Sequence, residues 1–277
     1  MQELALAVLR RLAERGARVG WLATPGGPLR FAVRGPPAGA RGARPPLLVV
    51  HGLGDSLAGW AQVAGPLARE RELHLLDLPG HGLSRDPPDW RLSTLAAAVA
   101  AYVRGLDAAP VLVGHSLGGW LSLRLAASGT LPLSGLLLIN PAGAPVDWGS
   151  FRALVSATDR DGAHRYLQAA WHRPPLTLRL LPDEVIAAMW TRATRGVLDS
   201  VAAGDFLCAD ELRGLRVPAR IVWGEADRLL PPGSLDFFRS ALPQADVALL
   251  PQCGHVPHLE APRALARALL KPLPPAA

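Results

Sequence analysis

Short apolar runs alternate with longer amphipathic segments along most of this chain. The pattern predicts strands at 47–50, 73–76, 111–113, 136–139, 220–223 and 247–250, and helices at 91–106, at 117–127 and up to about residue 270. The strands are nearly continuous apolar runs, so we expect both faces of the sheet to be covered. Alternation of strands with helices predicts an α/β fold, with a mostly parallel sheet flanked by helices.

One stretch departs from this alternation. Residues 144–212 read as several helices without a strand and carry six of the 15 aromatic residues of the chain. We interpret this stretch as a helical cap, or lid, inserted into a core made of residues 1–143 and 213–277. The segment 35–46, GPPAGARGARPP, is rich in proline and glycine and predicts an exposed loop between two early strands.

The net positive charge of the chain comes from its first 50 residues. The formal net charge is +6, residues 1–50 hold eight Arg and two Glu, and the remainder is balanced. A basic nucleic-acid-binding domain is therefore not expected. Leu4, Val8 and Leu12 lie four residues apart, which predicts an amphipathic N-terminal helix. That helix either docks on the domain or makes a weak peripheral contact with an anionic membrane surface.

Membrane spans and cofactors are not indicated. The longest window without charge, 125–146, contains three prolines and does not read as a spanning helix. Two cysteines in 277 residues suggest a reducing compartment, so we expect a cytoplasmic protein without a disulfide framework. No histidine or cysteine cluster has the spacing of metal ligands, so neither a metal nor an organic cofactor is expected.

The residues Gly114-His115-Ser116-Leu117-Gly118 form a G-x-S-x-G pattern between an apolar strand and a helix. This context is that of a nucleophile elbow, in which the serine sits on a sharp turn and needs very small neighbours. Ser116 then projects at a helix N-terminus, where free N–H groups favour a developing oxyanion. No phosphate-binding loop pattern competes, because Lys271 is the only lysine of the chain.

A serine nucleophile needs a base and an orienting acid, which follow it in the order acid, then histidine, in this kind of fold. Asp227 and His255 each lie in a loop after a predicted strand, in that order. His258 is the alternative base, and Glu225, Asp205 and Asp210 are alternative acids. His51 and His81 lie in glycine-rich turns, where we expect structural histidines bonded to backbone groups.

The turn His51-Gly52-Leu53-Gly54 follows the strand at 47–50. A turn in this place aims the N–H of Leu53 at the cleft, where it forms an oxyanion hole together with the N–H of Leu117. The oxyanion hole is therefore predicted from two backbone amides rather than from side chains.

Taken together, HGLGDS, LDLPGHGLS, GHSLGGWLSLRLA, WGEADRLLP and CGHVPHLEAP resemble the α/β-hydrolase superfamily over residues 47–270. The capped carboxylesterase and monoacylglycerol lipase branch is the most similar. The resemblance implies Ser116 as nucleophile, Asp227 as acid, His255 as base, and the amides of Leu53 and Leu117 as oxyanion donors. Related dehalogenases and epoxide hydrolases carry Asp at the elbow, so Ser116 argues against both activities.

We therefore expect a serine hydrolase that cleaves small carboxylic esters of apolar acyl groups through an acyl-enzyme intermediate. The same residues also suit a carbon–carbon hydrolase, a perhydrolase or an acyltransferase, and a ligand-binding receptor that keeps the fold is the non-catalytic alternative. Apolar residues of the cap are expected to line the acyl pocket: Trp148, Trp171, Met189, Trp190 and Phe206.

Overall fold

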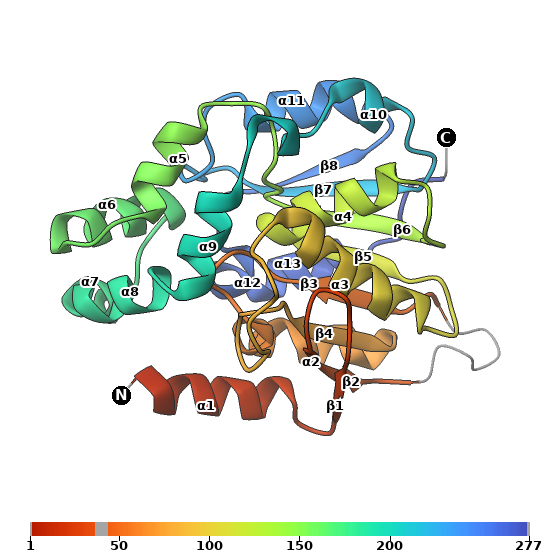
Figure 1. The fold of residues 1–277 in the computed structure, drawn as a ribbon, viewed down its shortest axis with the longest axis horizontal. Helices are drawn as coiled ribbons and strands as arrows, with labels where there is room; N and C mark the ends of the chain where they lie inside the picture. The colour runs from red at the N-terminus through yellow and green to blue at the C-terminus, as the bar shows by residue number, and fades with distance from the viewer. Residues whose placement is uncertain (1, 37–43, 276–277) are drawn as a thin grey trace.

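A single eight-stranded sheet runs through the computed structural model, which describes residues 2–36 and 44–275 (Figure 1). Its strands lie in the order β1-β2-β4-β3-β5-β6-β7-β8. Their bounds are β1 Arg18–Leu22, β2 Leu29–Arg34, β3 Leu47–Val50, β4 Leu73–Asp77, β5 Val111–His115, β6 Gly135–Ile139, β7 Ala219–Gly224 and β8 Asp246–Leu250. The predicted loop at 35–46 falls largely outside the described residues.

The strands β3 to β8 run parallel to one another, whereas the two strands at one edge are antiparallel, β1 to β2 and β2 to β4. Every residue of β3, β4, β5, β6 and β7 is buried, as the continuous apolar runs predict. The mostly parallel α/β sheet expected from the sequence is therefore confirmed. Because parallel strands end at the same edge, the loops after β3, β5, β6, β7 and β8 meet there.

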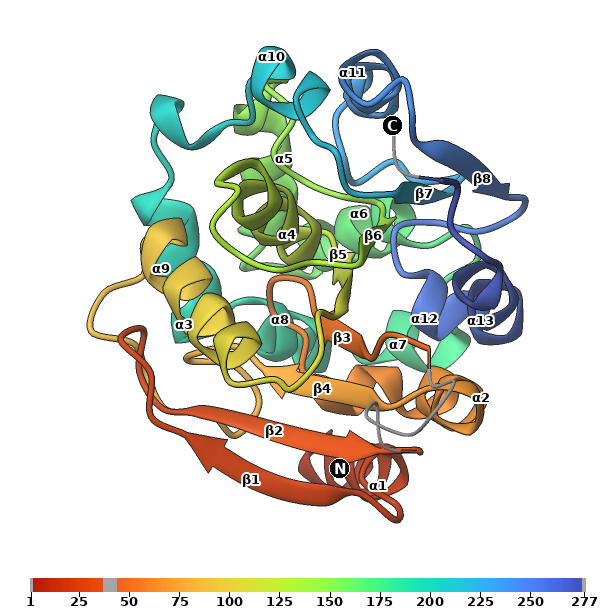
Figure 2. The same cartoon turned by 90° about the vertical axis from the view of Figure 1, so that its right-hand side faces the viewer.

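Helices cover both faces of this sheet, as Figure 2 shows. One face packs against α2 and α13, and the other against α3, α4 and α11, so each face has its own apolar core. The bounds of the helices outside the β6–β7 connection are α1 Gln2–Ala13, η1 Leu57–Trp60, α2 Ala61–Glu70, α3 Leu92–Arg104, α4 Leu117–Ala127, α11 Ser234–Ala241, α12 Pro257–Glu260 and α13 Pro262–Leu270.

The connection between β6 and β7 contains helices and no strand among its residues, all of which are described. These helices are α5 Trp148–Val155, α6 Arg160–Ala170, α7 Leu176–Leu180, α8 Pro182–Met189, α9 Arg192–Ser200, η2 Ala203–Asp205 and α10 Ala209–Arg213. Asp147, Asp159 and Thr191 start α5, α6 and α9, because each side chain accepts a hydrogen bond from a free N–H of the first turn. The division into core and cap at residues 144 and 212 stays a prediction.

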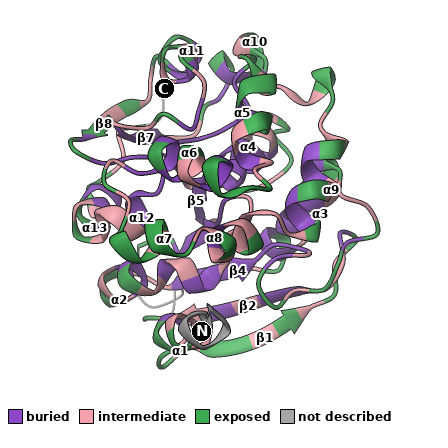
Figure 3. Ribbon diagram, turned by 90° about the vertical axis from the view of Figure 1, so that its left-hand side faces the viewer, coloured by how far each residue is buried: buried purple, intermediate pink, exposed green. Residues whose placement is uncertain are grey.

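The N-terminal helix docks on the domain, the first of the two predicted arrangements, because it packs against η1 and α2. Val8 and Leu12 are nevertheless 50% and 49% exposed, and Ala13 is buried. Figure 3 shows the contrast between the largely exposed edge strand β1 and the buried β4. A spacing of four identifies an apolar stripe on a helix but not the side that meets the domain. The side chain of Leu4 lies outside the described residues. Among the described helices, none combines the length and the apolarity that crossing a bilayer requires.

Candidate active site

The predicted elbow is present between β5 and α4. Ser116 has a φ of 51°, a left-handed conformation that is strained for a residue with a side chain. Its N–H donates to Ile139 O at 3.0 Å, and its carbonyl accepts from Ala142 N at 3.0 Å, so the turn is held by the loop after β6. A Cβ atom at Gly118 would lie 1.9 Å from Val50 O, which explains why glycine occupies this position.

The turn after β3 lies directly against this elbow. A Cβ atom at Gly52 would stand 3.2 Å from the Cβ of Ser116, so only glycine allows the two turns to approach this closely. Neither Leu53 N–H nor Leu117 N–H donates to another group in the described part of the chain. Leu117 is the first residue of α4, where the backbone N–H groups have no partner within the helix. Two free amides therefore flank the Ser116 turn.

Asp227 and His255 are brought together from the loops after β7 and β8. The Nδ1–H of His255 donates to Asp227 Oδ2 at 2.8 Å, and the Asp227 side chain has no exposed surface. Asp227 Oδ1 accepts from the backbone N–H groups of Leu229 and Leu230, at 2.9 and 3.1 Å. With Nδ1 carrying the proton, Nε2 of a neutral His255 is free to accept one.

Asn140 is a member of this group that the sequence reasoning did not assign a role. Its Nδ2 donates to Asp227 Oδ2 at 2.5 Å, its Oδ1 accepts from Gly224 N at 3.3 Å, and it is fully buried with a φ of 41°. Asparagine tolerates this backbone conformation better than most residues. The available signal was a polar residue directly after the apolar run of β6, at the same sheet edge as the predicted site.

The loops of Asp227 and His255 are also tied to the end of α6. Arg228 N donates to Ala169 O at 3.0 Å, and His255 N donates to Ala170 O at 2.7 Å. Glu260 strengthens this junction, because its carboxylate accepts from the N–H groups of Gly254, His172 and Arg173. The end of α6 is therefore part of the support of the Asp227–His255 pair.

The alternative acids and bases have other partners. Glu225 is exposed, and Asp205 and Asp210 accept hydrogen bonds from Ala202 N and Arg213 within their own helices. His258 stacks on the ring of Trp60 with the centroids 5.1 Å apart. None of these three carboxylates contacts His255 in the described residues, whereas Asp227 does.

His51 and His81 are bonded to the backbone as expected. The Nδ1–H of His51 donates to Gly52 O at 2.8 Å, and its Nε2 accepts from Leu78 N at 3.0 Å. His81 Nδ1–H donates to Pro79 O at 3.0 Å. Burial lowers the pKa of His81 to about 3, so this imidazole is neutral near pH 7.

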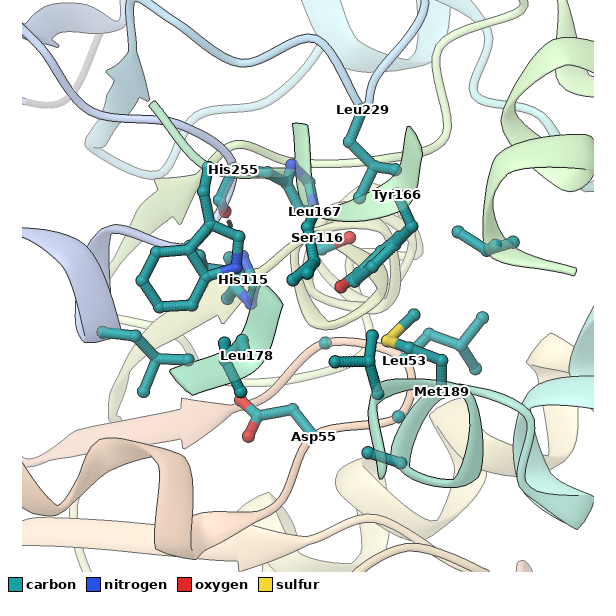
Figure 4. A pocket seen from close by; sticks show the side chains of 18 of the residues that line it. Leu53, Asp55, His115, Ser116, Tyr166, Leu167, Leu178, Met189, Leu229 and His255 are labelled. Carbon is teal, nitrogen blue, oxygen red and sulfur yellow. Dashed lines mark hydrogen bonds between the residues drawn. The ribbon is translucent and has the colours of Figure 1, made fainter. Parts of the chain in front are cut away.

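Ser116 and His255 line one cavity of about 260 Å³ between the sheet edge and the helices α5 to α8 (Figure 4). Most of its wall is apolar, and the Tyr166 side chain lies across it from Leu53 in Figure 4. Burial raises the pKa of Tyr166, so its hydroxyl stays uncharged. The apolar lining residues are Leu53, Phe151, Val155, Leu167, Trp171, Leu178, Val185, Ala188, Met189, Leu229, Val256 and Leu259.

Two of the five predicted pocket residues, Trp171 and Met189, lie in this wall. Trp148 lines a smaller pocket next to it that also includes Ser116 and Leu117, and Trp190 and Phe206 line neither of the two. Trp148 and Phe206 pack on Trp120 of α4, with ring centroids 5.9 and 5.5 Å away, and so attach the helices of this connection to the core. Trp190 instead faces the guanidinium of Arg195 at 5.8 Å. Aromatic content alone does not distinguish a helix-anchoring residue from a cavity-lining one.

Comparison with known proteins relates this architecture to a family. The model of the alpha/beta hydrolase family matches residues 47–268. A dihydrolipoyllysine-residue acetyltransferase component of an acetoin cleaving system from Pseudomonas putida is 32% identical over 226 residues, covering 78% of this chain. The matched part spans 60% of that protein's length.

Two further similarities cover nearly whole chains. A pimeloyl-[acyl-carrier protein] methyl ester esterase from Nitrosomonas europaea is 28% identical over 233 residues, which cover 79% of this chain and 91% of that protein. The crystal structure of a bacterial membrane phospholipase A superposes with a TM-score of 0.80 at 24% identity, covering 96% of this chain and 89% of the other. At this identity, the structural match describes the fold.

Proposed function

Because this chain belongs to the alpha/beta hydrolase family, we propose that it is a serine hydrolase that cleaves carboxylic esters of apolar acyl groups. The observation that carries the proposal is the Nδ1–H hydrogen bond of 2.8 Å from His255 to the buried Asp227, beside a cavity that Ser116 also lines. The fold alone does not determine the reaction, so the proposal rests on these side chains and on the elbow of Ser116.

The proposed mechanism proceeds through an acyl-enzyme. Ser116 Oγ attacks the ester carbonyl while His255 Nε2 takes its proton and returns it to the departing alcohol. Asp227 holds the imidazole orientation and stabilises the imidazolium. The N–H groups of Leu53 and Leu117 donate to the oxyanion. Water, deprotonated by His255, then attacks the acyl-enzyme, releases the carboxylic acid and regenerates Ser116.

The cavity indicates the class of ester. Its volume of about 260 Å³ lies just below the usual range for drug-sized ligands, roughly 300–1,000 Å³. An apolar wall of this size favours a short to medium acyl chain. Asp55 and Glu184 lie in the lining, and no Arg or Lys side chain belongs to it in the described residues. This distribution of charge favours a neutral ester over an anionic substrate.

Acyl transfer is the second candidate, because the relative with 32% identity is an acetyltransferase component. An acyl-enzyme on Ser116 can pass its acyl group to an alcohol or a thiol instead of water. Competition between water and ethanol or a small thiol measures this choice. A product ratio that exceeds the molar ratio of acceptor to water by orders of magnitude would identify a transferase.

The test of the proposed function is covalent labelling of the purified chain by a fluorophosphonate, with hydrolysis of p-nitrophenyl acetate, butyrate and octanoate measured in parallel. We expect labelling and butyrate hydrolysis that are both lost in Ser116→Ala. Ser122→Ala is the matched control, because Ser122 lies on α4 and donates to Gly118 O rather than facing the cavity. Labelling that persists in Ser116→Ala would refute the assignment of the nucleophile.

A further inference from the structure

A second group of polar side chains lies beside His255 and has no part in the proposed mechanism. Asp55 follows the turn after β3, His115 ends β5, and His258 belongs to α12. One ligand atom from each lies within 4.8 Å of the other two. All three residues line the cavity, and Figure 4 shows the Asp55 carboxylate on the same side of it as His115.

The hydrogen bonds of His115 define its tautomer. Its Nε2–H donates to His255 O at 2.8 Å, which leaves Nδ1 as a lone pair in the neutral ring. His115 Nδ1 is buried without a hydrogen-bond partner in the described residues. A buried lone pair without a partner is rare in folded proteins.

The Asp55 carboxylate presents a second unpaired atom to the same space. Its Oδ2 is buried and lies 3.3 Å from His258 Nε2, but this contact lacks the geometry of a hydrogen bond. The group thus offers a carboxylate oxygen and an imidazole nitrogen without hydrogen-bond partners among the described residues, the kinds of atom that bind divalent metal ions.

We propose that Asp55, His115 and His258 form a binding site for a divalent transition cation of the Zn²⁺ type. Two imidazole nitrogens and one carboxylate oxygen are a common ligand set for such an ion. The carbonyl of His255 orients His115 as the outer-shell partner of a metal-binding histidine does, and Trp60 fixes the ring of His258 by stacking. The three residues belong to separate segments of the chain, the loop after β3, the end of β5 and α12, so no ligand spacing reveals them in the sequence.

Tetrahedral coordination of an ion requires only a small movement of these three side chains. Bonds of about 2.0–2.2 Å place the ligands of a tetrahedral ion roughly 3.4 Å apart, so separations that lie within 4.8 Å must shorten by at most about 1.4 Å. Asp55 can supply this movement, because its side chain is 20% exposed toward the cavity, whereas that of His258 is 1% exposed. The fourth position of the ion faces the cavity and is left for water.

The site also predicts an effect on the chemistry of its neighbour. The rings of His115 and His255 are 5.1 Å apart between centroids, so an ion on His115 places positive charge close to His255. Positive charge disfavours the imidazolium that the proposed reaction needs. Zn²⁺ is therefore expected to inhibit ester hydrolysis when it occupies the site.

The test is isothermal titration of the full chain, freed of metal with a chelator, with ZnCl₂, together with the visible spectrum of the Co²⁺ form. We expect one ion per chain and tetrahedral Co²⁺ bands. Asp55→Asn and His258→Gln should each weaken binding by at least about 100-fold, since loss of an outer partner alone costs 10–100-fold. His164→Gln, an exposed histidine on α6, is the matched control and should bind like the parent.

The outcomes distinguish a failure of the metal-site proposal from a failure of the proposed hydrolase function. Ser116→Ala should bind Zn²⁺ like the parent, so zinc binding can be tested independently of ester hydrolysis. Thermal melting of each variant shows whether it is folded, and Asp55→Asn preserves the size of the side chain. The proposal would be overturned if Zn²⁺ did not bind, or if His164→Gln abolished binding while Asp55→Asn retained it. The unpartnered atoms of His115 and Asp55 would then be explained by a water that bridges them.

Discussion

The substitution Gly118→Ala tests how closely the elbow is packed against β3. A Cβ atom at Gly118 would lie 1.9 Å from Val50 O, 2.5 Å from Val50 C and 2.7 Å from His51 O, all of them backbone atoms. Real Cβ atoms essentially never approach other heavy atoms within 3.0 Å, so α4 must retreat by about 1 Å. The matched substitution is Gly105→Ala, because a Cβ there would meet Tyr102 O at 3.5 Å and Ala101 O at 3.9 Å, both ordinary van der Waals contacts.

Two effects of opposite sign determine the stability of the Gly118→Ala variant. Alanine is better than glycine inside a helix by about 1 kcal/mol, which favours the variant. Overpacking against atoms that cannot rotate away costs about 3 kcal/mol, the upper end of the usual range. The net loss is about 2 kcal/mol, which lowers the melting temperature by roughly 5 °C in a chain of this size. A shift of about 1 Å at Ser116 and Leu117 should also reduce kcat about 100-fold.

The assays are thermal unfolding followed by circular dichroism, and steady-state hydrolysis of p-nitrophenyl butyrate. Gly105→Ala should melt within about 2 °C of the parent and retain its rate, since surface changes are usually within ±0.5 kcal/mol. A Gly118→Ala variant that melts at or above the parent temperature with an undiminished rate would show that the elbow is not packed as described. Equal losses in both variants would point to a general effect of replacing glycine.

Three more predictions concern other parts of the site. Asn140→Ala removes the donor at 2.5 Å from Asp227 and should lower kcat/KM about tenfold, or about 1.4 kcal/mol; an unchanged rate would contradict its positioning role. Leu178→Trp fills the cavity and should slow octanoate hydrolysis more than acetate hydrolysis, whereas Leu180→Trp, on the exposed side of α7, should change neither. Burial lowers the pKa of His81 to about 3, so between that value and 6.5 the unfolded chain binds more protons and stability falls with falling pH. Between pH 7 and pH 5 the free energy of unfolding, measured in urea, should fall by about 2 kcal/mol in the parent. His81→Gln should lose less stability over this range, and identical losses in the two proteins would exclude His81 as the cause.

The predicted strands and elbow correspond to the structure because their signals are local. A continuous apolar run is buried on both faces where it lies inside the parallel sheet, whereas β8, at the edge, leaves Leu249 40% exposed. The pattern G-x-S-x-G needs its glycines for contacts made within a few residues of Ser116 and at Val50. Asp227 and His255 were recognisable for a related reason, since they lie four and five residues after such runs. Their catalytic roles stay predictions, although the hydrogen bond between them was expected.

What the sequence did not reveal depends on contacts between distant segments. Asn140 supports Asp227 only because β6 and β7 are neighbours in the sheet, which no local pattern states. Trp190 and Phe206 were expected in the pocket from their apolar character, but the side of a helix that faces a cavity follows from tertiary packing. The same limit applies to Val8, whose apolar stripe faces solvent.

The end of α6 serves two purposes at once. Its carbonyls at Ala169 and Ala170 hold the loops of Asp227 and His255, while Tyr166 on the same helix lines the cavity. A bulky ligand that pushes this helix outward would therefore also strain the Asp227–His255 pair. Grafting foreign helices between β6 and β7 would have to reproduce these two carbonyls, so the shape of the cavity and the alignment of Asp227 and His255 are mechanically coupled along α6.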